Sequence, residues 1–228
     1  MINNMIDNGY ADPESDAAST MRGSATYINI PAGIEAIGNN AFRDNRLLTN
    51  VVIPEGVRSI GDYAFAYCRR LTEIIIPISV TVIGKAAFRG CEQLSRIVLP
   101  PGVTVIESDT FSFCKSLIDI VIPQGVTAIG KGAFEGCRSL TVLEIPAGVT
   151  AIGAGAFKDC VELPALTLPP GLTIINPYTF YNCISLPALQ LPSAIAAIGD
   201  YAFFNCKSLP KVNLPDTLTD IGNWVFAY

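Results

Sequence analysis

The chain has 228 residues and a net charge of −5; half of its residues are hydrophobic and 15% are charged. The apolar residues come in short runs, never in the roughly 20-residue stretch that crosses a bilayer, so the chain is neither disordered nor membrane-inserted. The acidic balance and the lack of a Lys/Arg cluster argue against binding to nucleic acid.

Residues 1–24 are polar and rich in Asp, Asn, Ser and Ala. This composition cannot bury enough apolar surface to order itself, so we expect an N-terminal arm or cap. The first ten residues contain neither a basic segment nor an apolar one, which argues against a secretory signal peptide.

From residue 25 to residue 228 the chain repeats itself every 23 residues. The first complete column of the repeat is Phe42, Phe65, Phe88, Phe111, Phe134, Phe157, Phe180, Phe203 and Phe226. A second column is Pro31, Pro54, Pro77, Pro100, Pro123, Pro146, Pro169, Pro192 and Pro215. A fixed period of this length indicates a solenoid in which each unit buries its apolar face against its neighbours. We therefore predict a single solenoid domain of about nine units, the last one incomplete, with its phenylalanines stacked in the core.

Each unit is predicted to contain two short strands and one short helical segment. Alternating side chains over residues 96–99 predict a strand in which Ile97 and Leu99 face the core. Pro100 ends this strand because proline has no N–H to donate. A Pro-x-Gly turn and a second extended piece follow, over residues 102–106. In each unit the Phe-x-x-Cys-x-x-Leu spacing then favours a short α- or 3₁₀-helix.

The run Ile-Gly-x-x-Ala-Phe-x-x-Cys-x-x-Leu-x-x-Ile-x-Ile-Pro-x-x-Val resembles the BspA-type leucine-rich repeat over about residues 26–228. The resemblance implies a right-handed α/β solenoid with a parallel sheet on one side and short helical segments on the other. It also implies an adhesin-like protein, at the cell surface or secreted, that binds a host or matrix protein. It supplies no catalytic residues.

All seven cysteines occupy one position of the repeat: Cys68, Cys91, Cys114, Cys137, Cys160, Cys183 and Cys206. Equivalent side chains of stacked units point the same way, whereas a disulfide needs converging Cβ atoms and structural zinc needs four converging ligands. We expect buried free thiols that act as small apolar spacers. A disulfide and a metal site are the alternatives, and both are disfavoured by this parallel arrangement.

The sequence gives no indication of catalysis or of a cofactor. There is no histidine to serve as the base for a cysteine nucleophile. The glycines follow the structural period and form neither a phosphate-binding loop nor a dinucleotide fingerprint. The carboxylates fall at positions that a solvated surface explains.

The outward positions of the first strand form two columns that could contact a partner. One column contains Glu73, Arg96 and Asp119; the other begins with Val52, Ile75, Val98 and Val121. Outward β-branched residues can reflect strand propensity alone, but a contiguous exposed apolar stripe can also mark a protein-binding site. Our hypothesis is that these seven residues form the recognition face.

The last unit stops soon after Phe226, in the run from Trp224 to Tyr228. Repeat arrays usually need polar end units, because an open end exposes core and strand edge. Three interpretations fit: Trp224 and Tyr228 cap the end, the chain is part of a longer protein, or another copy stacks on it head to tail through Trp224, Phe226 and Tyr228.

Overall fold

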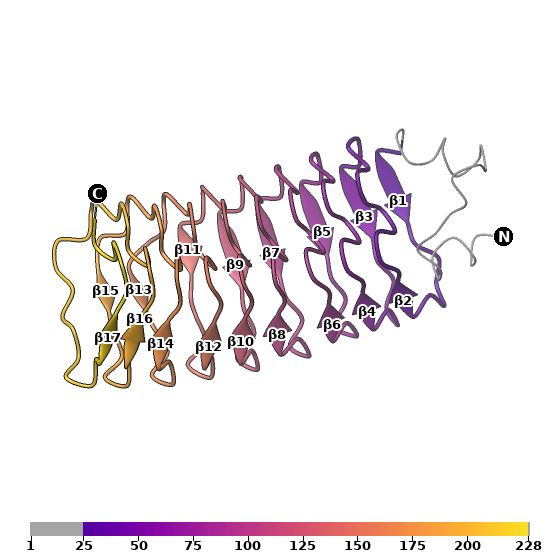
Figure 1. Cartoon of the computed structure of the whole chain (residues 1–228). Helices are drawn as coiled ribbons and strands as arrows, with labels where there is room; N and C mark the ends of the chain where they lie inside the picture. The colour runs from indigo at the N-terminus through magenta and orange to yellow at the C-terminus, as the bar shows by residue number, and fades with distance from the viewer. Residues whose placement is uncertain (1–24, 228) are drawn as a thin grey trace.

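The computed structural model describes residues 25–227, which wind into a rod of stacked turns (Figure 1). The expected N-terminal arm or cap, residues 1–24, lies outside the described residues, as does Tyr228. Two rows of short strands run along the rod, one on each side. All of the recorded strand pairs are parallel and join each residue to the one 23 positions further along the chain, as Val51 is joined to Ile74.

The first row holds the strand that precedes the recurring proline of each unit. Its members are β1 (Tyr27–Asn29), β3 (Asn50–Val52), β5 (Glu73–Ile75), β7 (Arg96–Val98), β9 (Asp119–Val121), β11 (Val142–Leu143), β13 (Leu166–Thr167) and β15 (Leu189–Gln190). We call its solvent-facing side the long-strand face. The middle residue of each three-residue strand points inward, as the alternation in the sequence predicts; Ile97, for example, is 1% exposed.

The second row follows the turn after the proline, and its strands are two residues long. They are β2 (Ala36–Ile37), β4 (Ser59–Ile60), β6 (Val82–Ile83), β8 (Val105–Ile106), β10 (Ala128–Ile129), β12 (Ala151–Ile152), β14 (Ile174–Ile175), β16 (Ala197–Ile198) and β17 (Asp220–Ile221). The isoleucine that closes each of β2 to β16 packs into the core. The predicted two-strand unit is therefore present.

The segment predicted as a short helix is instead a run of turns, and residues 25–227 contain no helix. Each run carries two left-handed residues four positions apart, such as Tyr63 with φ of 56° and Tyr67 with φ of 62°. A left-handed residue cannot continue a right-handed helix. The N–H groups of Tyr63, Phe65 and Tyr67 donate to carbonyl oxygens of the next unit at 2.9, 2.8 and 2.6 Å, forming a third ladder between units.

The core is one continuous column that runs the length of the rod. The phenylalanines from Phe65 to Phe180 are completely buried, and neighbouring rings along the column lie 5.1 to 5.7 Å apart and nearly parallel. Inward-facing Ile, Leu and Val side chains of both strand rows surround the column. The predicted phenylalanine stack is confirmed.

Candidate functional site

Four apolar side chains stand in a line on the long-strand face. Val52, Ile75, Val98 and Val121 are 42%, 73%, 50% and 43% exposed. The strand register places Val52 beside Ile75, and Val98 beside Val121. All four predicted apolar residues therefore lie where the sequence analysis put them. They stand in line because each closes a short strand of the same row.

A second line of side chains, two residues earlier in each strand, carries charge. The Nε atom of Arg96 lies 3.1 Å from an oxygen of Asp119, and the Arg96 side chain is still 66% exposed. Glu73 is also exposed, and it forms no ion pair with any residue between 25 and 227. The three predicted charged residues thus lie beside the apolar stripe, and of their two carboxylates that of Glu73 has no cation partner within residues 25–227.

Two more exposed apolar residues lie around the corner of the rod from β5, and the sequence analysis missed them. Ile78, in the turn after Pro77, is 76% exposed, and Val82 on β6 is 55% exposed. Other units place a polar residue, alanine or proline at the Ile78 position, such as Glu55 and Pro101. A large aliphatic side chain, which no other unit has there, was the signal that could have found these residues.

The cysteine column is buried, and all seven thiols are free. Each Sγ atom lies 3.1 to 3.3 Å from the carbonyl oxygen of the phenylalanine 26 residues earlier, as Cys114 does from Phe88. Each thiol therefore donates a hydrogen bond that links one unit to the unit before it. Burial raises the pKa of the Cys114 thiol to about 12, so it stays protonated at neutral pH.

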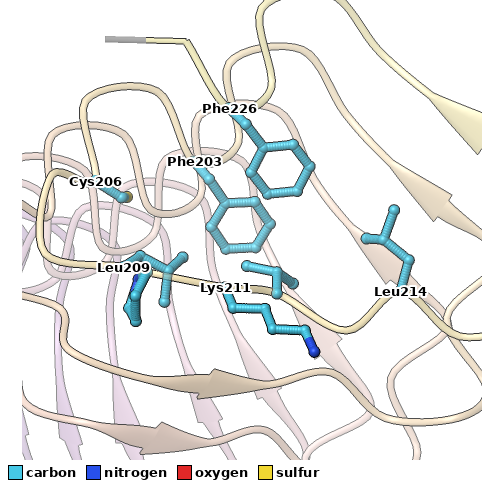
Figure 2. A pocket seen from close by; sticks show the side chains of 8 residues that line it. Phe203, Cys206, Leu209, Lys211, Leu214 and Phe226 are labelled. Atoms are coloured by element: carbon cyan, nitrogen blue, oxygen red, sulfur yellow. The ribbon is translucent and has the colours of Figure 1, made fainter.

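A hollow of about 390 Å³, with apolar and polar atoms in its lining, lies at the C-terminal end of the described rod. Figure 2 shows the rings of Phe203 and Phe226 one above the other, with Leu214 and the Lys211 side chain across the hollow. Phe226 is 41% exposed and Trp224 is 63% exposed. Two of the three predicted self-assembly residues thus lie at an exposed end, whereas Tyr228 is outside the described residues.

Between residues 25 and 227, no group of three or more His, Cys, Asp or Glu side chains is arranged to hold a metal ion. The same part of the chain includes no helix of the length and apolarity that crossing a membrane requires.

A solenoid of 23-residue repeats, with parallel strands and a stacked phenylalanine core, is the architecture of a leucine-rich-repeat protein. The family description "BspA type Leucine rich repeat region" matches residues 20–141 and 127–228, in six copies. The chain belongs to this family. No curated protein matches the sequence.

Solved bacterial structures share the architecture. A leucine-rich cell surface protein of Faecalibacterium prausnitzii is 28% identical, with a TM-score of 0.63, over 88% of this chain and 72% of that one. A leucine-rich repeat protein of T. pallidum is 30% identical, with a TM-score of 0.59, over 83% of this chain and 79% of that one. The pneumococcal vaccine antigen PcpA, 22% identical with a TM-score of 0.62 over 86% of this chain and 58% of that one, shares the fold alone.

Proposed function

We propose that this protein is a noncatalytic scaffold that binds a protein partner through the long-strand face. The observation that carries the proposal is the stripe of Val52, Ile75, Val98 and Val121, which is exposed on the long-strand face and bordered by charged side chains. Apolar cores with polar rims are the usual anatomy of protein interfaces. The isoleucine at position 75 is the most exposed of the four and would be the central anchor.

Two further observations support this function. Repeat proteins of this family are generally scaffolds rather than enzymes, and the F. prausnitzii protein is described as a cell surface protein. A surface or secreted location and an adhesin-like role, with a host or matrix protein as the partner, follow as part of the proposal.

Paired substitutions on the same sheet row test the proposal. The variant I75E/V98E places two charges in the stripe, whereas T167E/Q190E places the same charges at equivalent exposed positions of β13 and β15. Each purified chain is immobilised and exposed to a mixture of extracellular-matrix proteins, and retained proteins are identified. We expect a partner that binds the wild type and T167E/Q190E at least about tenfold more tightly than I75E/V98E, because a charge in an apolar contact is costly to desolvate. Equal binding to all three chains would show that the stripe reflects strand propensity alone.

A second candidate function is end-to-end assembly, which the apolar side chains of Phe203, Leu214 and Phe226 in the lining of the hollow favour. A second copy that stacked on this end would cover the exposed ring of Phe226, and such a head-to-tail contact propagates into filaments. Light scattering that rises with protein concentration, and is abolished by F226E, is the expected result. A mass that stays monomeric at every concentration would exclude this mode.

A further inference from the structure

The long-strand face carries a pattern of side chains that is complementary to itself. We propose that this face binds the same face of a second copy, around a two-fold axis that runs parallel to the strands and passes between the units of Glu73 and Arg96. The inference rests on the proposed function, because it adds a second copy of this chain as a partner of that same face. It is a closed, side-by-side contact, different from stacking at the C-terminal end.

Such an axis reverses the order of the units and keeps each residue at its position along the strand. Glu73 of one copy then faces Arg96 of the other, and the same pair forms a second time across the axis. Both side chains are available for this contact: Arg96 is 66% exposed despite its bond to Asp119, and Glu73 forms no ion pair within residues 25–227. Opposite charges in a two-fold contact are a form of self-complementarity that closed dimers require.

The same operation brings apolar side chains opposite apolar side chains. Around the axis, Ile75 meets Val98 of the second copy, and one step further out Val52 meets Val121. At the edge Tyr27, 57% exposed, meets Val142, which is 55% exposed.

Polar residues match as well. Asn50 faces Asp119 of the second copy and Asn29 faces Glu144, so that each carboxylate meets an amide rather than another carboxylate. All four are on the outer side of the long strands or directly beside them. At the corner of the rod, exposed Ile78 faces exposed Pro101. The complementarity thus extends over the six units from β1 to β11.

Other placements of the axis lose this match. An axis on the unit of Arg96 would oppose that residue with its own copy and would oppose Glu73 with Asp119. An axis between Arg96 and Asp119 would bring Ile75 against Glu144. Like charges and buried unpaired charges both disfavour association. The axis between the units of Glu73 and Arg96 avoids both kinds of mismatch.

The contact is small. Six units about 4.8 Å apart, each with two outward side chains about 7 Å apart along the strand, give a footprint below the roughly 800 Å² per partner of a standard interface. We therefore expect a reversible dimer whose population depends on concentration. A dimer of this strength could also be displaced by a tighter foreign partner on the same face.

Mixing two charge-reversed variants tests the two-fold register. Alone, E73R would place two arginines opposite each other in its dimer, and R96E would place two glutamates opposite each other. An equal mixture of E73R and R96E forms a dimer in which both cross-axis contacts join a cation to a carboxylate. The weight-average mass is measured by sedimentation equilibrium from about 5 to 500 μM, a range chosen for a contact at the weak end of the interface scale. Thermal unfolding of each variant verifies that these exposed substitutions leave the fold intact.

The expected result is a wild type that dimerises with concentration, two variants that each associate about tenfold or more weakly, and a mixture that regains dimer. Three outcomes would overturn the inference: a wild type that is monomeric throughout, a dimer unaffected by either reversal, or a mixture that remains monomeric. T167E/Q190E serves as the control that retains association. A monomeric wild type leaves the binding of a foreign partner untouched. Conversely, foreign binding that ignores I75E/V98E refutes the proposed function even when the dimer forms.

Discussion

A single phenylalanine in the middle of the rod is the sharpest test of the stacked core. The ring of Phe134 is completely buried, and its centroid lies 5.5 Å from those of Phe111 and Phe157. We expect F134A to lower the free energy of unfolding by about 3–5 kcal/mol, through lost burial and the cavity left behind. Urea unfolding measures the loss. The control F226A removes a ring that is already 41% exposed and should cost less than half as much. A loss below about 1 kcal/mol for F134A would contradict the buried column.

The seven buried thiols should lower the free energy of unfolding at alkaline pH. Burial raises the pKa of Cys68, Cys114 and Cys206 to about 12, from about 9 in the unfolded chain, and raises the pKa of the other four thiols as well. Because the folded chain holds these protons more tightly, the stabilisation is complete below about pH 9 and is lost as pH rises toward 12. Each thiol should remove about 1.4 kcal/mol of unfolding free energy per pH unit in this window.

Urea unfolding at several values between pH 8 and pH 10.5 measures this dependence. The variant C114A serves as the internal reference, because other groups titrate equally in both chains. Its unfolding free energy should fall less steeply with pH than that of the wild type, by about 1.4 kcal/mol per pH unit. Parallel curves for the two chains would mean that the Cys114 thiol is not protected by burial.

In the run of turns, a large side chain of one unit packs against a small residue of the next, as the ring of Tyr67 packs against Gly90. Gly90 has φ of 69°, and a Cβ added there would lie 2.7 Å from the Cδ1 atom of Tyr67 in the preceding unit. We expect G90A to cost about 1–2 kcal/mol for the left-handed backbone, and about 1–3 kcal/mol more for overpacking against that ring.

Gly155 provides the matched control for this prediction. Its φ is 63°, but the nearest atom to an added Cβ is 3.8 Å away, in ordinary contact. Denaturant unfolding of G90A and G155A should therefore differ by the overpacking cost alone. Equal losses would indicate that Tyr67 moves aside without penalty.

Both strands of each unit could be predicted from the sequence, but the turn run between them could not. Apolar residues at i, i+3 and i+6 fit a short helix and a run of turns equally well. The residues that decide between them, such as Tyr63 and Asp109, adopt positive φ without being glycine, so they give no warning in the sequence. Their conformation is set by hydrogen bonds to the next unit, which only the stacked structure supplies.

The candidate surface was predictable to a similar extent. The positions of Val52 and Ile75 follow from strand alternation, whereas the corner residue Ile78 lay in a segment interpreted only as a turn. The thiol-to-carbonyl bonds could not be foreseen either, because they depend on how one unit is set against the preceding one.

At the scale of the whole rod, the two self-association modes differ in where they stop. The two-fold contact of the long-strand face uses the same surface on both copies, so it closes at a dimer. Stacking through the hollow at Phe226 joins two different surfaces and can continue. Mass against concentration therefore separates them: the first saturates at twice the monomer mass, and the second does not.

Prolines remove N–H donors from the long-strand row in its last three units. The N–H groups of Thr72, Ile118 and Thr141 each donate to a carbonyl of the preceding unit, at 2.9 to 3.2 Å. The equivalent positions of the next three units are Pro164, Pro187 and Pro210, which have no N–H. The strands are three residues long in β9 and two in β11, β13 and β15, and residues 211–213, which follow the third of these prolines, form none. The second row is continuous there, through Thr219 N–H, which lies 2.9 Å from the carbonyl oxygen of Ala196.

Amide hydrogen exchange should follow this difference. We expect slow exchange in β3 and β9, faster exchange in β13 and β15, and slow exchange in β14 and β16 of the same units, because local opening requires fewer broken hydrogen bonds where the ladder is interrupted. The variant P187T restores the missing donor opposite the carbonyl of Pro164 and should slow exchange in β13 and β15 alone. Uniform protection along both rows, or exchange unchanged by P187T, would show that the prolines do not set the local stability of the rod.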